Sequence, residues 1–341
     1  MTHTMSPQST PDVSLAQQLL AMTLGVAQTQ VLCVAAQLGL ADLVRDEPKT
    51  VEVLAAATGT HAPTLARLMG VLVHLGLFAE PAPGQFLCTP FGASLQTEAP
   101  YSVRHYAMLM GGEWFAQAWP HLLQSIQAGT NAFESVVGMN VYRYLQQHPT
   151  GGTVLQQAMS DLSTQEGLAI REAYDFTSCQ TLVDVGGGRG GLLATLLQAF
   201  PALRGILFDV PSVVESAQAV LHTDALQGRC QLVGGDFLVA VPAGGDLYVL
   251  KRILIDRTDD EARTLLTNIR HAVAPQGRVL VADPESTSLY GKLLDMFMLM
   301  VQGGRLRTNA EVQALFTQTG FQLTRAMETR SALRLLEGVP V

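Results

Sequence analysis

Three carboxylates in the second half of the chain have the spacing needed to bind a nucleotide-like ligand. Asp184 lies in the apolar run 181–185, which leads directly into the glycine-rich stretch 186–191. Asp209, 25 residues further on, ends a second apolar run and is placed to accept hydrogen bonds from both hydroxyls of a ribose. Asp236 ends a third run and can bind an adenine amino group, with Phe237 packed beside the ring.

The glycine-rich stretch suits close approach of the backbone to such a ligand. Gly186 and Gly188 tolerate φ > 0 and carry no side chain that would block the ligand. An apolar helical pattern follows at once, so free N–H groups at the helix start face whatever lies over the turn. Any one of the three carboxylates can be explained as a solvated loop acid. Three of them in register with a glycine turn favour a binding site.

The elements that must position these residues alternate between strand and helix from residue 181 onward. This alternation with short loops predicts an α/β fold with a doubly wound, mostly parallel sheet, which binds ligands at the carboxyl ends of its strands. The expected strands are 181–185, 205–209, 230–234, 246–250, 278–282 and 332–337, and the expected helices are 191–200, 211–219, 259–272, 293–301 and 309–319.

The first hundred residues predict a helical domain with a winged-helix shape. Residues 15–43 read as helix with apolar residues nearly all round, which indicates burial on several sides. Because this helix has no upstream partner, we expect it to pack against a second copy of the chain in a homodimer. Residues 50–90 then read as helix, turn, helix and hairpin, with Gly59 and Gly76 ending the two helices.

A winged helix is often a DNA-binding module, but the charge of this one argues against that function. Residues 1–100 contain seven acidic residues and three Lys or Arg, and the would-be recognition helix carries only Arg67 with His74 near its end. Neutralising phosphates requires several cations. A scaffold or dimerisation module is therefore the better interpretation.

Residues 101–175 predict helices broken by glycine and proline at 111–112, 120, 129 and 149–152. They are rich in methionine and aromatic side chains, which either line a pocket for a flat aromatic ligand or form plain core. The candidate pocket residues are Tyr106, Met110, Trp114, Met139, Tyr142 and Ile255, together with Met296 and Met300 from the later helix.

Composition bounds the remaining possibilities. The 341 residues are 48% hydrophobic and carry a formal net charge of −8, which disfavours nucleic-acid and anionic-membrane partners. The four cysteines are far apart, with neither disulfide-framework nor zinc-ligand spacing, so we expect reduced thiols, no metal and a cytoplasmic location. The expected organisation is a disordered tail (1–14), a dimerisation domain (15–100), bridging helices (101–175) and a ligand-binding domain (176–341).

The sequence resembles the small-molecule O-methyltransferases of plants and bacteria that use S-adenosylmethionine (SAM). Residues 184–190 match the family's glycine motif, and residues 246–252 match its fourth-strand motif. The resemblance covers nearly the whole chain and implies a SAM cofactor, S-adenosylhomocysteine (SAH) as product and a Rossmann-like domain. The residues it implies for SAM binding are Met159, Ser163, Asp184, Gly186, Gly188, Asp209, Val210, Gly235, Asp236, Phe237, Lys251 and Arg252.

The departure from this family is at the catalytic base. The family's fourth strand is followed by His-Asp-Trp, whose histidine deprotonates the acceptor hydroxyl, whereas this chain has Ile255, Asp256 and Arg257. One acid that flanks the base corresponds to Asp283, and the other is replaced by Leu306. Isoleucine is no base. The bacterial phenazine N-methyltransferases, which this chain resembles around the fourth strand, lack the histidine too.

We therefore expect a methyltransferase acting on an aromatic or heteroaromatic secondary-metabolite intermediate. Nitrogen or carbon is the favoured acceptor atom, because it needs positioning rather than deprotonation. An acidic hydroxyl is an alternative, and so is a SAM-binding relative that catalyses hydroxylation, decarboxylation or a pericyclic reaction. His105, Asp256 and Asp283 are the candidates for a substitute base.

Overall fold

The structure is a computed structural model that describes residues 13–221, 223, 226 and 228–341, without the side chains of Val13 and Tyr142. The chain forms two compact units, Met1–Gly112 and Glu113–Val341, and each is described by itself. Of the predicted disordered tail, residues 1–12 lie outside the described residues, whereas Val13 and Ser14 already belong to the first helix.

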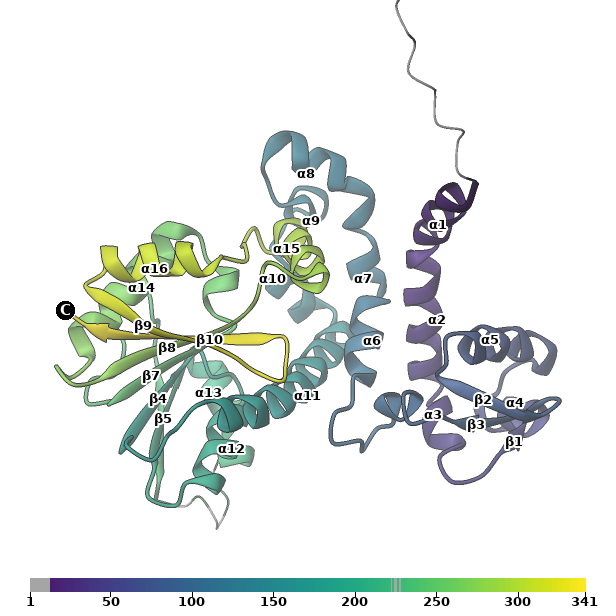
Figure 1. The fold of residues 1–341 in the computed structure, drawn as a ribbon, viewed down its shortest axis with the longest axis horizontal. Helices are drawn as coiled ribbons and strands as arrows, with labels where there is room; N and C mark the ends of the chain where they lie inside the picture. The colour runs from purple at the N-terminus through teal and green to yellow at the C-terminus, as the bar shows by residue number, and fades with distance from the viewer. Residues whose placement is uncertain (1–12, 222, 224–225, 227) are drawn as a thin grey trace, which may run out of the picture. The chain divides into compact units, whose positions relative to one another are not determined.

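The first unit is a helical domain with the winged-helix pattern expected from the sequence (Figure 1). Thr50 caps α4 by accepting a hydrogen bond from the Val53 N–H, and Gly59 ends it in the left-handed conformation with φ 65°. Strands β2 and β3 form the wing hairpin, to which the short strand β1 adds. Its elements are α1 (Val13–Thr23), α2 (Gly25–Gln37), α3 (Leu40–Leu43), β1 (Lys49–Thr50), α4 (Val51–Thr58), α5 (Ala62–His74), β2 (Phe78–Ala82), β3 (Gln85–Cys88), η1 (Gly92–Leu95) and α6 (Arg104–Met110).

The expected helix over residues 15–43 is divided into three, α1 to α3, and its first part exposes apolar side chains. Leu15, Leu19, Leu20 and Met22 expose between 62% and 75% of their surface. No single helix among the described residues is long and apolar enough to cross a membrane, and only the bent pair 14–23 and 25–37 passes that test jointly. The first unit thus presents an uncovered apolar face on α1.

The second unit begins with short helices that lead into α11, a helix of 25 residues. Pro149 is its first residue, where the missing proline N–H costs nothing, so the predicted break at 149–152 falls at the helix start. A Cβ at Gly152 would lie 3.0 Å from the carbonyl oxygen of Leu145, which explains the glycine inside the first turn. These elements are α7 (Glu113–Ala116), η2 (Trp119–His121), α8 (Leu122–Ala128), α9 (Ala132–Val137), α10 (Val141–Gln147) and α11 (Pro149–Ala173).

The rest of the second unit is a seven-stranded sheet in the order β6-β5-β4-β7-β8-β10-β9. Its first five strands are parallel, as the sequence predicts, whereas β10 pairs antiparallel with β8 and β9. Strand β9 was not expected. The elements are β4 (Thr181–Val185), α12 (Gly191–Ala199), β5 (Arg204–Asp209), α13 (Pro211–Leu221), β6 (Cys230–Gly234), β7 (Leu247–Lys251), η3 (Leu254–Asp256), α14 (Asp259–Ala272), β8 (Arg278–Pro284), α15 (Leu289–Val301), α16 (Asn309–Gln318), β9 (Phe321–Glu328) and β10 (Leu333–Pro340).

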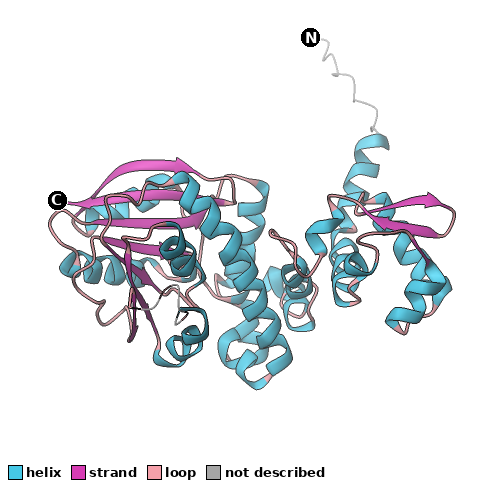
Figure 2. Ribbon diagram, turned by 90° about the horizontal axis from the view of Figure 1, so that it is seen from below, coloured by secondary structure: helices cyan, strands magenta, loops and turns pink. Residues whose placement is uncertain are grey.

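Helices cover both faces of this sheet (Figure 2). One core cluster joins the sheet to α11, α12 and α13, and a second joins its other face to α14 and α16. The strand order reverses between β4 and β7, so the carboxyl ends of these two strands flank the crevice in which folds of this kind bind ligands.

Candidate active site

The glycine turn after β4 is closely packed at Gly187 and open at Gly188. Gly186 and Gly188 have φ values of 68° and 59°, which only glycine adopts without strain. A Cβ at Gly187 would lie 2.6 Å from Asp184 Oδ2, whereas a Cβ at Gly188 would meet nothing within 4 Å. The turn therefore packs against Asp184 at Gly187 and leaves open space over Gly188.

Asp209 at the end of β5 is held against this turn. Its Oδ2 accepts a hydrogen bond of 2.9 Å from the Gly188 N–H, and its Oδ1 accepts one of 2.7 Å from the Val210 N–H. Each carboxylate oxygen keeps a second lone pair for another donor. The two backbone bonds orient a half-buried carboxylate beside the open space at Gly188.

Asp184 is buried, with 1% of its surface exposed, and neither of its carboxylate oxygens has a hydrogen-bond partner. Burial raises the pKa of its carboxyl to about 7; Lys251 opposes this rise and Asp209 adds to it. An unsatisfied buried carboxylate is costly. Its place at the carboxyl end of β4 indicates that a bound group completes this site.

The segment after β6 contributes an aromatic ring and an exposed carboxylate. Asp236 is exposed, and its Oδ1 accepts a hydrogen bond of 2.8 Å from the Leu238 N–H. Gly235 donates its N–H to the Asp209 carbonyl oxygen at 2.9 Å. The Arg257 guanidinium lies 5.2 Å from the centroid of the half-buried Phe237 ring, in a cation–π contact.

Two cations at the end of β7 meet one buried acid from α11. Lys251 Nζ donates to Ser163 Oγ at 2.8 Å and lies 3.4 Å from Glu166 Oε2. Arg252 Nη2 lies 2.6 Å from Glu166 Oε1. Among the described residues other than glycine, Arg252 alone has a positive φ, 56°. Such strain is typical of functional sites. Glu166 was not predicted from the sequence, although its position three residues after Ser163 puts both on one helix face.

Ile255, at the base position of the resembled family, lies in an apolar cluster. It exposes 3% of its surface and packs in this cluster with Leu294, Met298 and Leu306, against which Phe297 is also packed. Phe297 in turn stacks on Phe115, with ring centroids 4.7 Å apart. The segment after β7 therefore places hydrocarbon at the position of the resembled family's histidine.

Asp283, near the end of β8, lies beside the 3-10 helix η3 that contains Ile255. It exposes 5% of its surface, and its Oδ1 has no hydrogen-bond partner. Burial raises the pKa of its carboxyl to about 7, and Asp256 adds to this rise. Arg252 opposes the rise most strongly, and Arg307 and Arg334 oppose it less. Asp283 is thus a buried group that titrates near neutral pH.

The other predicted pocket residues are dispersed. Trp114 is buried in edge-to-face contact with Phe115 and Phe133, so it serves the helical core. Met159, which was predicted to bind SAM rather than the acceptor, is 38% exposed on α11. Met139 and Met296 are half-buried, and Met300 is fully buried. His105, Tyr106 and Met110 belong to α6 of the first unit and stay predictions, and the Tyr142 side chain lies outside the described part.

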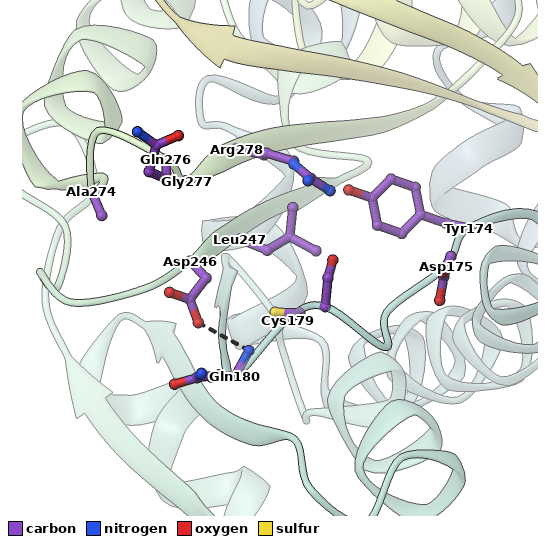
Figure 3. Close-up of a pocket in the computed structure, with 11 residues that line it drawn as sticks. Tyr174, Asp175, Cys179, Gln180, Asp246, Leu247, Ala274, Gln276, Gly277 and Arg278 are labelled. Atoms are coloured by element: carbon purple, nitrogen blue, oxygen red, sulfur yellow. Dashed lines mark hydrogen bonds between the residues drawn. The ribbon is translucent and has the colours of Figure 1, made fainter.

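A cavity of about 240 Å³ lies at the amino ends of the strands, away from the glycine turn, and none of the predicted site residues lines it (Figure 3). Asp246 in its wall accepts the N–H groups of Gln180 and Thr181 at 2.9 and 2.8 Å. The Tyr174 hydroxyl donates to Glu337 at 2.6 Å. These polar groups satisfy one another, and the cavity that they line lies at the amino ends of the strands.

The comparisons with known proteins agree with this geometry. Residues 119–322 match the O-methyltransferase domain, and residues 20–97 match the O-methyltransferase dimerisation domain. The phenazine O-methyltransferase PhzM of Lysobacter antibioticus is 40% identical over 96% of this chain and 97% of its own length. The phenazine-1-carboxylate N-methyltransferase of Pseudomonas aeruginosa is 33% identical over 95% and 97%. CalO1, a methyltransferase in calicheamicin biosynthesis solved with SAH, superposes with a TM-score of 0.89 at 33% identity. The superposition covers 98% of this chain and 100% of the CalO1 chain.

The chain therefore belongs to the O-methyltransferase family, and it is a SAM-dependent methyltransferase with a dimerisation domain. The residues present fit the cofactor. The turn leaves open space at Gly188, and Asp209 has lone pairs beside it. Asp184 provides two buried carboxylate oxygens that await donors.

Proposed function

We propose that the protein methylates an aromatic or heteroaromatic intermediate of secondary metabolism at an atom that is already nucleophilic, with a ring nitrogen favoured over an ordinary hydroxyl. The observation that carries this proposal is the burial of Ile255 in an apolar cluster. The two phenazine methyltransferases among the relatives support a flat tricyclic acceptor, one by its O- and the other by its N-methylation.

In this proposal the carboxyl ends of β4, β5 and β7 hold the cofactor. SAM supplies the electrophilic methyl group. Asp209 accepts hydrogen bonds from the ribose hydroxyls of the cofactor, and Asp184 accepts hydrogen bonds from other donor groups of the cofactor. The backbone of Gly186 and Gly188 allows the cofactor to approach closely. Lys251 and Ser163 fix the wall contributed by α11. The remaining predicted contacts of Met159, Val210, Gly235, Asp236, Phe237 and Arg252 belong to the same proposal.

The acceptor is positioned rather than deprotonated. Phe297, the partly buried side chain packed against the Ile255 cluster, offers apolar surface against which a flat ring can be held and water excluded. Holding two reactants in a productive geometry accounts for several orders of magnitude in rate, and a ring lone pair needs no base. Nitrogen methylation is therefore compatible with an isoleucine at the base position.

An assay with two acceptors that share one ring system tests this proposal. Phenazine-1-carboxylate offers ring nitrogens, and a hydroxyphenazine offers a hydroxyl. SAH formation is followed, and the methylated atom is identified by mass spectrometry and NMR. We expect faster turnover of the nitrogen acceptor. Efficient methylation of the hydroxyl alone would overturn the preference for nitrogen.

A second candidate is methylation of an acidic hydroxyl, which Asp283 and the 40% identical phenazine O-methyltransferase favour. Burial raises the pKa of Asp283 to about 7, so its carboxylate can accept a proton near neutral pH. Asp283→Asn distinguishes the candidates. Hydroxyl methylation then loses its rate and the acid limb of its pH profile, whereas nitrogen methylation keeps its pH profile.

A further inference from the structure

Glu166 provides a buried negative charge at the edge of the sheet assigned to the cofactor. Its side chain is 3% exposed, and its two oxygens face Lys251 at 3.4 Å and Arg252 at 2.6 Å. Burial alone would raise the pKa of its carboxyl, but Arg252 and Lys251 outweigh burial and hold that pKa below its ordinary value. Glu166 is therefore ionised at neutral pH.

The neighbouring acids do not replace this charge. Asp184 interacts with Lys251, but burial raises the pKa of Asp184 to about 7, so much of it is protonated at neutral pH. Asp283 interacts with Arg252, but burial raises the pKa of its carboxyl to about 7 as well. Removing the charge of Glu166 would leave Lys251 and Arg252 as two adjacent cations without a direct counter-ion.

The charge state of this edge matters because the cofactor and its product differ in charge. SAM carries a sulfonium, an ammonium and a carboxylate, so its net charge is +1 at neutral pH. SAH has a neutral thioether and a net charge of zero. A buried positive field therefore weakens binding of SAM relative to SAH, because charges in a poorly solvated site interact over several ångströms.

We propose that Glu166 is a positioning residue that offsets one of the two positive charges of Lys251 and Arg252, so that the site accepts the cationic sulfonium of SAM and not only the neutral thioether of SAH. This rests on the proposed function, which assigns the carboxyl ends of β4, β5 and β7 to the cofactor. Glu166 touches neither reactant in this proposal. It acts through the two cations that it holds.

The ratio of two dissociation constants tests the proposal, and it is measured by calorimetry on the full chain with SAM and with SAH. Glu166→Gln should raise the dissociation constant of SAM about tenfold more than that of SAH, as expected for one unbalanced charge in a partly buried site. Glu166→Asp keeps the charge and should keep most of the wild-type ratio. Glu172→Gln is the matched control, since Glu172 lies on the same helix, 45% exposed and 3.4 Å from Arg330.

Arg252→Gln provides the opposite test and does not depend on the folding of Glu166→Gln. It leaves Glu166 with Lys251 alone, so the ratio should move in favour of SAM. The double variant Glu166→Gln/Arg252→Gln restores the wild-type net charge and should restore the ratio.

A purely structural role of Glu166 predicts a different outcome. Loosening α11 from β7 would weaken SAM and SAH equally, and an equal loss in Glu166→Gln with an unchanged ratio in Arg252→Gln overturns the proposal. If the wild-type protein binds neither SAM nor SAH, the assignment of the cofactor edge fails instead. The two failures are therefore distinguishable.

Discussion

Ile255 and Leu306 lie in one buried apolar cluster, although they come from η3 and from the loop before α16. They expose 3% and 4% of their surface. By the resemblance to the O-methyltransferases, these two positions correspond to the catalytic histidine and to an acid that flanks it. A polar pair has thus been replaced by an apolar pair that satisfies its own packing. Under the proposed function, the absence of a base at these positions is therefore part of the packed core rather than an isolated substitution.

The first prediction follows from this pairing. Ile255→His should not produce an efficient O-methyltransferase, because the imidazole would be buried among apolar side chains and one of the two acids that would orient it is replaced by Leu306. We expect a loss of stability of about 1–3 kcal/mol, measured by urea unfolding. Ile255→His/Leu306→Glu supplies the partner and should methylate hydroxyphenazine faster than the single variant. A large gain with Ile255→His alone would show that only the base was missing.

The second prediction concerns Asp209. Asp209→Ala should weaken SAM binding by roughly 1.5–3 kcal/mol, the cost of charge-assisted hydrogen bonds to the ribose hydroxyls. Calorimetry measures this loss. Asp175→Ala is the control, because Asp175 is an acid near the amino ends of the strands, beside the cavity of Figure 3. Unchanged affinity in Asp209→Ala would remove this residue from the cofactor site.

The sequence predicts the parallel strands β4, β5, β7 and β8 well because most of their residues are buried and they read as continuous apolar runs. Strand β4 has the predicted bounds, Thr181–Val185. Strand β9 was missed because it is an edge strand whose residues are largely exposed, with Arg325 and Glu328 among them. Its pairing with β10 depends on tertiary contacts that no local pattern records.

The candidate site was also predictable only in part. Asp209 and the glycine turn could be found because backbone geometry demands those residue types at that spacing. Glu166 could not, since a single acid in a polar helix looks like a solvated residue until β7 brings two cations against it. Trp114 shows the converse, because its type suggests a pocket wall whereas its contacts are with Phe115 and Phe133.

The third prediction concerns pH and Asp184. An aspartate titrates near pH 4 in the unfolded chain, whereas burial raises the pKa of Asp184 to about 7 in the folded protein. Between these values the folded state binds the extra proton, so the stability from this group falls as the pH rises. Asp184→Asn removes the titration. Its stability relative to wild type should therefore increase from pH 5 to 7, by at most about 1.4 kcal/mol per pH unit.

Urea unfolding of wild type and Asp184→Asn at several pH values measures this difference. Above pH 7 the difference should level off, because the carboxyl is then ionised in both states. Asp283 titrates in the same range and is present in both proteins, so its contribution cancels. A stability difference that stays constant from pH 5 to 8 would contradict the raised pKa of Asp184.

The fourth prediction separates backbone strain from cofactor contact at Gly188. Gly188→Ala and Gly228→Ala both place a side chain at positive φ, 59° and 76°, in open space. Each should lose about 1 kcal/mol of stability. Only Gly188→Ala should also weaken SAM binding, because its methyl group enters the space beside Asp209. Equal SAM affinities in the two variants would place the cofactor elsewhere.

The last prediction concerns α1 and the homodimer. Leu19 and Leu20 expose 65% and 69% of their surface in the single chain. Burying a leucine side chain fully contributes about 1.5–3 kcal/mol, so an interface that covers these side chains would stabilise the dimer substantially. We expect a dimer by light scattering and a monomer for Leu19→Glu/Leu20→Glu. Val239→Glu, at a 76% exposed position in the second unit, should remain dimeric. A monomeric wild type contradicts the homodimer, and a dimeric double variant places the interface away from α1.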